Sequence, residues 1–374
     1  MFIGVPREQD PHEHRVGLNP AGAARLVKQG HTVVVEAGAG EAAHFSDRDF
    51  EKAGAHTVYS HEEVCQRADL TCRIGRITGA EVDLFREGQI ICAFHHLAVA
   101  PKDLVKKLMD MGVTLIGYEI IRDARGNLPV LIPFSEMAGQ MAIHIAAQYL
   151  RTDAGGRGVL LGNVPGVAPP TVLIVGAGHL GRTACRQALA NGAHVIVMDH
   201  SLNKLRELNR EVQGRAVTAL VGMERLERYI AIADVVIGAV LVPGQKTEVV
   251  ITEAMVGRMK PGSVVIDLSI DQGGCIATSR PTTPDQPTFI VNDVVHFCVP
   301  NVTTNIPRTA TRAFVNAALP FLLVHGDKGM KQAIGDDPGL AKGVYMYRGR
   351  LMHQDIGKAM GLPVTSVEEI LKEA

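Results

Sequence analysis

The stretch TVLIVGAGHLGRTACRQALANGAHVIVMDHS at residues 171–201 decides the fold class of this 374-residue chain. It opens with an apolar, β-branched run, passes through a glycine-rich turn into a helical pattern, and ends in a second apolar run. Gly176, Gly178 and Gly181 give the turn the spacing G-x-G-x-x-G. A strand, a glycine turn, a helix and a second strand in this order are typical of a doubly wound parallel sheet.

Each glycine of this turn has its own physical reason. Gly176 permits the sharp turn, Gly178 lets the backbone approach a pyrophosphate, and Gly181 lets the helix lie close to the strand. Asp199 ends the second strand, where its carboxylate is placed to accept the ribose hydroxyls and to repel a 2′-phosphate. The stretch predicts a dinucleotide site that prefers NAD to NADP, although the neighbouring His200, when it carries a proton, can tolerate a phosphate. The alternative is a Rossmann domain that binds nothing.

The alternation of strands and helices continues on both sides of this stretch. Downstream we expect helices at about 180–191 and 202–210 and strands at 171–175, 194–198, 216–221, 234–238 and 263–267. Upstream we expect strands at about 1–5, 31–40, 56–60, 69–75 and 88–94, and helices after residue 19 and near 47–53 and 62–68. Each part is therefore predicted to be a parallel, helix-covered sheet of the α/β class.

The order of these parts predicts a discontinuous domain. The apolar residues of 133–150 have helical spacing and indicate a connecting helix, which a Gly- and Pro-rich loop follows. A helix from about residue 307 leads into a polar tail that has only the N-terminal sheet to join. We predict a Rossmann domain at 131–304, inserted into a catalytic domain made of 1–130 and 305–374.

Composition excludes several classes of function. With 46% apolar and 21% charged residues, the chain has the composition of a folded globular protein. Its 38 Lys and Arg nearly balance its 39 Asp and Glu, so no net charge attracts nucleic acid or an anionic membrane. No run of about 20 apolar residues predicts a transmembrane helix. The expected partners are small molecules and copies of the same chain.

The cysteines have neither the spacing of a disulfide framework nor that of a metal site. They are Cys65, Cys72, Cys92, Cys185, Cys275 and Cys298. A chain of this size needs no disulfide bonds for stability. We expect reduced, mostly buried thiols in a cytoplasmic protein, and we predict no bound metal.

Several long, irregular stretches resemble the alanine dehydrogenase family, which shares its fold with the NAD-binding part of proton-translocating transhydrogenases. They span essentially the whole chain and include IGVPRE at 3–8, RVGLNPAGAARLVKQGH at 15–31, PFSEMAG at 133–139, GGRGVLLGNVPGV at 155–167, MKPGSVVIDLSIDQGG at 259–274 and IPRTAT at 306–311. The resemblance implies NAD-dependent oxidative deamination of a small L-amino acid, L-alanine first, to a 2-oxo acid and ammonia, and the reverse reaction. It also implies a homo-oligomer, commonly a hexamer.

The resemblance assigns roles to individual residues. Arg15 corresponds to the group that holds the substrate carboxylate, and His96 to the catalytic histidine that stabilises charge at the reacting carbon. Asp271 corresponds to the acidic partner in proton transfer with water and the amine. The implied coenzyme contacts, besides the glycines and Asp199, are Ser135, Lys204, Val240, Leu241, Asp271 and Asn301. From the residues alone, Arg15 could be a surface arginine, His96 a packed histidine and Asp271 a turn residue.

The sequence departs from the family pattern around the substrate. Arg73 occupies the position of a substrate-binding lysine; it can still bind a carboxylate but cannot release a proton at neutral pH. His95 replaces an apolar residue, Phe134 a methionine, and NVTTN at 301–305 a segment that usually contains Asn-Met-Pro. These changes predict altered substrate choice, with a side chain larger or more polar than a methyl group as the hypothesis.

Three other functions remain open from the sequence. The chain could be a non-catalytic NAD-binding homologue, or the nucleotide-binding subunit of a transhydrogenase with a separate membrane partner. It could also be a related dehydrogenase or reductase with a different amino- or imino-acid substrate, including one that joins an amine to a 2-oxo acid.

Overall fold

The computed structural model describes residues 1–372, except for the side chains of 325–328, and divides them into two compact units. Unit 1 comprises Met1–Phe134, Pro243–Gln245 and the chain from Thr304 onward, and unit 2 comprises Ser135–Val242 and Lys246–Thr303. Residues 243–245 belong to unit 1 although we placed them in the inserted part. The reason is local, because the side-chain amide of Gln245 donates a 2.9 Å hydrogen bond to Asp355.

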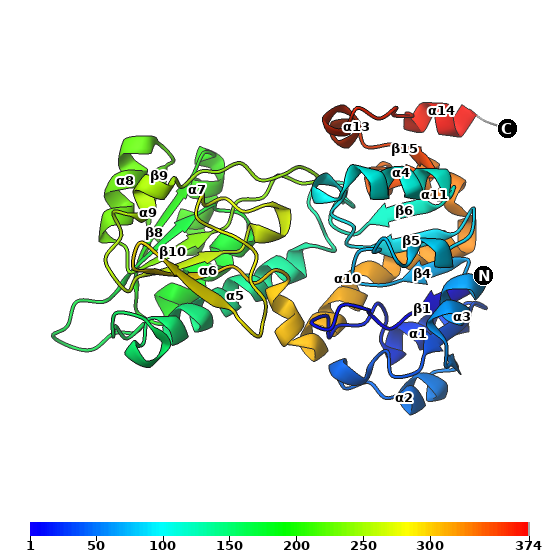
Figure 1. Cartoon of the computed structure of the whole chain (residues 1–374), viewed down its shortest axis with the longest axis horizontal. Coiled ribbons are helices and arrows are strands. Elements are labelled where there is room, and N and C mark those ends of the chain that lie inside the picture. The colour runs from blue at the N-terminus through cyan, green and yellow to red at the C-terminus, as the bar shows by residue number, and fades with distance from the viewer. Residues whose placement is uncertain (373–374) are drawn as a thin grey trace. The chain divides into compact units, whose positions relative to one another are not determined.

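Unit 1 is built on an eight-stranded sheet with the order β15-β14-β6-β5-β4-β1-β2-β3 (Figure 1). The strands are β1 (Phe2–Val5), β2 (Thr32–Glu36), β3 (His56–Val58), β4 (Leu70–Cys72), β5 (Ile90–Ala93), β6 (Thr114–Gly117), β14 (Val344–Tyr347) and β15 (Arg350–Leu351). Neighbours among β1 to β6 are parallel, whereas β14 pairs antiparallel with both β6 and β15. The carboxyl ends of β1, β4, β5 and β6 therefore lie at one edge of the sheet.

In unit 1, side chains cap the starts of the helices α1 (Pro20–Lys28), α2 (Asp47–Lys52), α3 (His61–Arg67) and α12 (Pro338–Ala341). Its other helices are α4 (Lys102–Asp110), α10 (Pro307–Lys328), α11 (Met330–Asp336), α13 (Gln354–Met360) and α14 (Val367–Lys372). Asn19 caps α1 through the N–H of Gly22, with Pro20 in its first turn, and Ser46 forms a capping box with Asp49 in α2. One apolar cluster packs α3, α4 and α13 against the sheet.

The C-terminal tail joins the sheet of unit 1 through two strands, β14 and β15, that we did not predict. The residues between β14 and β15, Arg348 and Gly349, both have positive φ, 46° and 78°. Such pairs form the tight turns of two-residue hairpins. The tail therefore ends the sheet with a short antiparallel hairpin, in addition to its helices.

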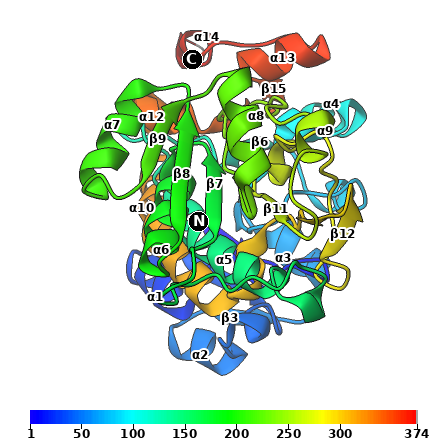
Figure 2. The same ribbon diagram turned by 90° about the vertical axis from the view of Figure 1, so that its left-hand side faces the viewer.

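Unit 2 is built on a seven-stranded sheet with the order β12-β13-β11-β10-β7-β8-β9 (Figure 2). The strands are β7 (Thr171–Val175), β8 (His194–Asp199), β9 (Val217–Leu220), β10 (Val235–Gly238), β11 (Val264–Asp267), β12 (Thr288–Val291) and β13 (Val294–Phe297). All neighbours are parallel except β12 and β13. This hairpin was not predicted; its turn residues, Asn292 and Asp293, have φ of 51° and 58°.

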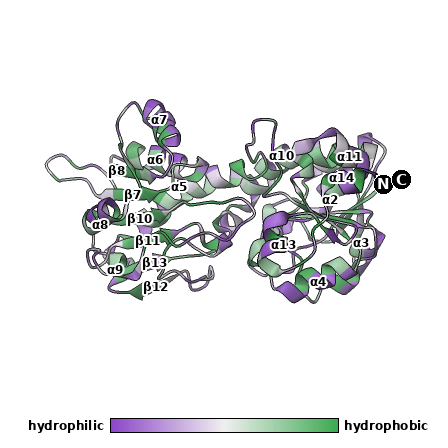
Figure 3. Ribbon diagram, turned by 90° about the horizontal axis from the view of Figure 1, so that it is seen from above, coloured by the Kyte–Doolittle hydropathy of each residue, from purple (hydrophilic) through white to green (hydrophobic). Residues whose placement is uncertain are grey.

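Helices cover both faces of the unit 2 sheet. They are α5 (Ile132–Tyr149), which begins in unit 1, α6 (His179–Ala190), α7 (Leu202–Glu211), α8 (Met223–Ile232) and α9 (Glu253–Val256). In β7, Val172 and Ile174 pack with α5, α6 and α7, whereas Leu173 and Val175 pack with α8 and α9. Strands buried on both faces explain why these runs are continuously apolar, as the green strands of Figure 3 show.

Two further observations concern the whole described chain. All six cysteines are free and buried, as predicted. Among the helices within residues 1–372, none combines the length and the apolar character that a membrane crossing requires.

Candidate coenzyme and substrate sites

The glycine turn of unit 2 leaves open space at one of its three glycines. A Cβ atom at Gly176, whose φ is 115°, would lie 2.2 Å from the carbonyl oxygen of Ala239. A Cβ at Gly181 would lie 1.8 Å from the carbonyl oxygen of Gly176. At Gly178, in contrast, a Cβ would meet no atom within 4 Å. Packing therefore requires glycine at the first and third positions, whereas the second borders a space that a ligand can occupy.

The helix that follows this turn presents an uncapped N-terminus to that space. Gly178 is the N-cap of α6, no side chain caps the helix, and its first turn contains no acidic residue. The first N–H groups of a helix lack partners inside the helix, and the helix dipole favours an anion beside them. The open position and the uncapped helix end together fit the pyrophosphate of a dinucleotide.

Asp199 connects the end of β8 to the glycine turn. Its Oδ2 accepts the N–H of Ala177 and its Oδ1 that of Ser201, both at 2.7 Å. A carboxylate oxygen can accept more than one hydrogen bond, so acceptor capacity for a ribose hydroxyl remains. The exposed ring of His200 lies 3.5 Å from Oδ1, and Lys204 is exposed on the first turn of α7.

The loops after β10, β11 and β13 are joined by hydrogen bonds at the same sheet edge. Asp271, in the short helix Ile270–Gln272 after β11, accepts the N–H of Asn301 at 2.8 Å. Val240, after β10, donates its N–H to the hydroxyl of Ser269 at 3.0 Å. The structure thus brings together three of the predicted coenzyme contacts, with exposed Leu241 following Val240. Ser135 lies half-buried in α5.

Arg15 of unit 1 is held in one orientation. It is only 4% exposed, so it is not the surface arginine of the alternative interpretation. Its Nε and Nη2 donate to the two carboxylate oxygens of Glu13 at 2.7 and 2.5 Å. Its guanidinium carbon lies 5.1 Å from the ring centre of Phe134. A paired carboxylate and a stacked ring together fix the plane of the guanidinium.

Arg73 is buried between two carboxylates. Its Nη1 donates to Glu81 at 2.8 Å, and its Nη2 lies 3.5 Å from Glu8. Glu8 also accepts the N–H groups of Ile74 and Gly75 at 2.6 and 3.1 Å. Burial raises the pKa of Glu8 to about 7, against the opposing charge of Arg73. The guanidinium of Arg73, which we predicted to bind the substrate, therefore already has two protein carboxylates as partners.

The Arg73 cluster continues to His61 at the start of α3. The imidazole of His61 lies 2.7 Å from Glu36 and 3.5 Å from Glu81. Hydrogen bonds with Cys65, Glu36 and Glu81 raise the pKa of His61 to about 11. Burial alone would raise the pKa of Glu81, but the hydrogen bond from His61 and the charge of Arg73 lower it. His61 is therefore a cation that balances the surplus of carboxylates.

His96 lies three residues beyond the end of β5 and has a buried ring nitrogen without a hydrogen bond. Its backbone is left-handed, with φ of 48°, and its N–H donates to Oε1 of Glu119 at 2.6 Å. The hydroxyl of Tyr345 donates to the same oxygen at 3.0 Å. The imidazole stacks near Phe94, and its Nδ1 is buried without a hydrogen bond. A buried polar atom without a partner is costly unless a ligand satisfies it.

The neighbouring His95 has a different environment. Its side chain is fully enclosed, and its Nε2 lies 3.1 Å from the carbonyl oxygen of Ile91. Burial lowers the pKa of His95 to about 4, so the ring is neutral near pH 7. This departure from the family pattern is a packed core histidine and adds no second titrating group.

An aromatic cluster adjoins Arg15 and His96. Phe94 lies 5.1 Å from Phe134 and 5.5 Å from Tyr118, and Tyr118 lies 4.9 Å from Phe314, measured between ring centres. The buried hydroxyl of Tyr118 lies against the thiols of Cys72 and Cys92. The cluster is therefore a buried aromatic core that packs against Arg15 through Phe134 and against His96 through Phe94.

Sequence reasoning missed the acidic residues that hold these groups. They are Glu8, Glu13, Glu81 and Glu119 in unit 1 and Asp267 in unit 2. Glu119 follows β6 closely and Asp267 ends β11, so their position at the carboxyl ends of strands was a usable signal. Tyr345 carried no such signal, because its role depends on the pairing of β14 with β6.

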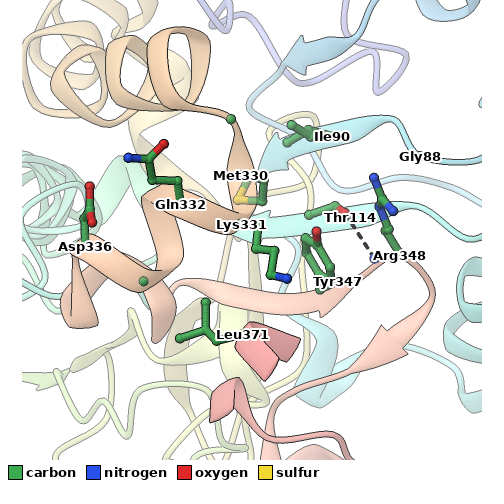
Figure 4. A pocket seen from close by; sticks show the side chains of 12 residues that line it. Gly88, Ile90, Thr114, Met330, Lys331, Gln332, Asp336, Tyr347, Arg348 and Leu371 are labelled. Atoms are coloured by element: carbon green, nitrogen blue, oxygen red, sulfur yellow. Dashed lines mark hydrogen bonds between the residues drawn. The ribbon is translucent and has the colours of Figure 1, made fainter. Parts of the chain in front are cut away.

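A cavity of about 620 Å³ in unit 1 lies apart from these residues (Figure 4). Its lining includes Ile90 and Thr114, the first residues of β5 and β6, together with Lys331 and Arg348. The cavity borders the first residues of β5 and β6, whereas His96 lies beyond the last residue of β5. The cavity is therefore at the opposite edge of the sheet from His96. It contains none of the predicted site residues.

Family models and known proteins can now be compared with this geometry. The model "Alanine dehydrogenase/PNT, N-terminal domain" matches residues 4–138, and "Alanine dehydrogenase/PNT, C-terminal domain" matches 142–354. The chain belongs to the alanine dehydrogenase/PNT family. This result confirms the family predicted from the sequence motifs.

Individual members of the family match over their full length. The alanine dehydrogenases of Mycolicibacterium smegmatis and Halomonas elongata are each 43% identical over 371 residues, covering 99% of this chain and 100% of theirs. A solved L-alanine dehydrogenase structure has a TM-score of 0.89 at 38% identity, covering 96% of this chain and 99% of its own. The transhydrogenase from Sinorhizobium meliloti, at 24% identity and a TM-score of 0.77, covering 95% of this chain and 100% of its own, shares the fold. These matches confirm the two-domain α/β fold class.

Proposed function

We propose that this chain is an NAD-dependent amino-acid dehydrogenase. It converts a small L-amino acid, L-alanine first, together with water and NAD, to a 2-oxo acid, ammonium, NADH and a proton, and it catalyses the reverse reductive amination. The main support for this proposal is the glycine turn, which leaves open space at Gly178. The chain that contains it is 43% identical, over 99% of its length, to proteins named alanine dehydrogenase.

Unit 2 is the proposed coenzyme domain. The N-terminus of α6 and the turn of Gly176, Gly178 and Gly181 hold the pyrophosphate, and Asp199 holds the ribose and selects NAD over NADP. Further contacts are proposed at Ser135, Lys204, Val240, Leu241, Asp271 and Asn301. When bound, NAD accepts the hydride from the α-carbon of the amino acid.

Unit 1 supplies the proposed substrate groups. Arg15, oriented by Glu13 and Phe134, binds the substrate carboxylate through parallel hydrogen bonds. His96 hydrogen-bonds the nitrogen or oxygen on the reacting carbon through its ring and stabilises the charge that develops there. Arg73 is the second proposed substrate contact, and Glu8 and Glu81 hold its guanidinium in place.

Proton transfer accompanies the deamination. Oxidation of the α-carbon yields an iminium, water adds to it, and ammonia leaves as the carbonyl forms. Asp271 is the proposed acidic partner for the water and the amine, and the main-chain N–H of Asn301 holds its carboxylate. A carboxylate with a main-chain donor on one oxygen keeps a fixed orientation and still has acceptor capacity.

We further propose a cytoplasmic homo-oligomer, with a hexamer as the expected assembly. Six free, buried thiols are compatible with a reducing compartment. Light scattering coupled to gel filtration measures the mass directly; a monomer of 40.1 kDa would reject the assembly.

A screen of L-amino acids with NAD tests the proposed activity. NADH formation is followed by absorbance, with His96→Ala as the control that loses turnover but retains NADH binding. Activity with no amino acid would leave a non-catalytic NAD-binding protein. Activity only in the reverse direction, with a 2-oxo acid and an amine other than ammonia, would indicate the related reductase.

A second substrate class has a specific observation in its favour. Phe134, which stands where the family pattern has a methionine, lies against Arg15 and packs on Phe94. This change beside the proposed carboxylate-binding residue favours an amino acid with a side chain larger or more polar than a methyl group. In the same screen, a clear preference for alanine over all others would dismiss this candidate.

A further inference from the structure

Asp267, the last residue of β11, has a fully buried carboxylate that organises the loop after it. Its Oδ1 accepts the N–H of Ser269 at 3.0 Å. Its Oδ2 accepts the N–H groups of Cys275 and Ile276 at 3.0 and 3.2 Å. These bonds close the segment 268–276 into a loop whose two ends meet at one carboxylate.

The closed loop carries Asp271 and determines where its carboxylate lies. Asp271 is in the single turn Ile270–Gln272, between the two ends that Asp267 holds. Its Oδ1 accepts the N–H of Asn301, which follows β13. The loops after β11 and β13 are thereby connected through Asp271.

The same loop also holds the segment after β10. Ser269 donates its N–H to Asp267, while its hydroxyl accepts the N–H of Val240 at 3.0 Å. Val240 and Asp271 therefore both depend on a loop that one buried side chain closes. Neither residue touches Asp267 in any of these hydrogen bonds.

Two glycines keep the space that this carboxylate needs. A Cβ at Gly238 would lie 2.5 Å from the sulfur of Cys275 and 3.0 Å from Oδ1 of Asp267. A Cβ at Gly274, whose φ is 81°, would lie 3.0 Å from Oδ2. Close packing on both sides leaves the carboxylate one position, so the loop has one closed geometry.

We propose that Asp267 is a positioning residue of the coenzyme site: it contacts neither coenzyme nor substrate, but fixes Asp271 and the backbone of Val240 by closing the loop 268–276. This inference rests on the proposed function, because it assigns those residues to NAD. It goes beyond the proposed function because it states that NADH affinity and turnover depend on a buried side chain that is not one of the predicted coenzyme contacts.

Asparagine at position 267 separates shape from hydrogen bonding. Backbone donors approach both oxygens of Asp267, one at Oδ1 and two at Oδ2. An amide has a donor group on one side, so in either orientation Asp267→Asn places N–H groups against N–H groups. The substitution retains the side-chain volume and opens the loop at one end.

Asp234 provides a matched control within the same sheet. It precedes the first residue of β10, is nearly buried, and accepts the N–H of Thr171 at 2.9 Å. Its Oδ1 lies 3.0 Å from Lys260 and 3.3 Å from Arg157. Asp234→Asn therefore removes the charge of a comparably buried carboxylate and weakens its ion pairs. This residue lies at the opposite edge of the sheet, away from the predicted coenzyme contacts.

The test compares both variants with the unmodified protein, well below their unfolding midpoints. We expect Asp267→Asn to raise the Kd for NADH and to lower kcat, each by about tenfold or more, because small displacements of positioned groups are costly. Asp234→Asn should lower the unfolding midpoint and change both constants by no more than about twofold. Equal losses in the two variants, or an unchanged Asp267→Asn enzyme, would overturn the proposal.

Two further measurements keep the test decisive. If Asp267→Asn does not fold, Ser269→Ala removes the hydroxyl that accepts the N–H of Val240 and contacts the thiol of Cys275 in the same loop. It should raise the Kd for NADH about three- to tenfold; no change would reject the proposal. If the unmodified protein forms no NADH with any amino acid, the proposed function fails by itself. Amide hydrogen exchange then decides: faster exchange of 268–276 and Asn301 in Asp267→Asn supports the positioning role, and unchanged exchange overturns it.

Discussion

The backbone N–H of His96 donates a hydrogen bond of 2.6 Å to Oε1 of Glu119. His96 has a left-handed backbone, with φ of 48°, which is uncommon for a residue with a Cβ. The hydrogen bond to a buried carboxylate compensates for this conformation and sets the direction of the imidazole. Tyr345, from the C-terminal hairpin, donates a second hydrogen bond to the same oxygen and helps to hold the carboxylate in place.

The first prediction concerns this acceptor oxygen. Glu119→Gln retains a carbonyl oxygen for both donors, whereas Glu119→Ala removes it. We expect Glu119→Ala to lower kcat by about ten- to a hundredfold through misplacement of His96, and Glu119→Gln to stay within about fivefold of the unmodified enzyme. Steady-state kinetics with L-alanine and NAD measures both. Equal kcat in Glu119→Ala and the unmodified enzyme would show that His96 needs no support from Glu119.

The second prediction separates the glycines of the nucleotide turn. Gly181→Ala places a Cβ against the carbonyl oxygen of Gly176, so it should destabilise the fold by about 1–3 kcal/mol. Gly178→Ala meets open space, so its unfolding free energy should change by less than about 1 kcal/mol. Its affinity for NADH should nevertheless fall, because the added methyl group occupies the space assigned to the pyrophosphate. Thermal unfolding and NADH titration check the pair; full affinity in Gly178→Ala would place the coenzyme elsewhere.

The third prediction concerns coenzyme choice. Asp199→Asn removes a negative charge beside the proposed ribose site. It also turns an amide N–H toward the N–H of Ala177 or Ser201, so both coenzymes should bind more weakly and the ratio between them is the quantity to compare. We expect the preference for NADH over NADPH, as a ratio of kcat/KM values, to fall about tenfold, which corresponds to about 1.4 kcal/mol. Lys204→Gln serves as the control that should not relax the preference in this way. An unchanged ratio in Asp199→Asn would assign coenzyme selection to other residues.

The fourth prediction follows from the raised pKa of His61. Hydrogen bonds with Cys65, Glu36 and Glu81 raise it to about 11, above the value of 6.5 for an unperturbed histidine. The folded protein therefore retains a proton that the unfolded chain releases above pH 6.5. This stabilising contribution is complete below that pH and is lost as pH rises toward 11.

Unfolding midpoints measured at several pH values test this contribution. Between pH 6.5 and 9, the unmodified protein should lose more stability than His61→Gln, because the variant lacks the titrating group. Chemical denaturation at each pH gives the difference between the two proteins, in which other titrating groups cancel. Parallel pH profiles would contradict the assignment of a charged His61.

The fold was predictable wherever strands and helices alternate with regular spacing. The stretch 171–201 contains its own strand, turn and helix signals, and all of them form as predicted. The hairpins β12–β13 and β14–β15 were missed because short edge strands lack a long apolar run. Their turns, at Asn292 and Asp293 and at Arg348 and Gly349, were the available signals, since such residues tolerate positive φ.

The sequence pointed to candidate site residues only where a residue lies at or soon after the end of a strand or matches a family motif. His96, Asp199 and Asp271 are candidates of this kind. The roles of their acidic supports depend on contacts between distant segments: Tyr345 and Glu119 are 226 residues apart. Arg73 illustrates the limit, because its position suggested a substrate ligand and only the structure shows Glu8 and Glu81 on its guanidinium.

The most direct measurement of the central claim uses L-alanine labelled with deuterium at the α-carbon. Incubation with NAD, followed by mass spectrometry of the coenzyme, shows whether the hydride comes from that carbon. We predict NADH that carries one deuterium, formed together with pyruvate and ammonium, and none from His96→Ala. NADH without deuterium, or no NADH with any labelled L-amino acid, would contradict an amino-acid dehydrogenase.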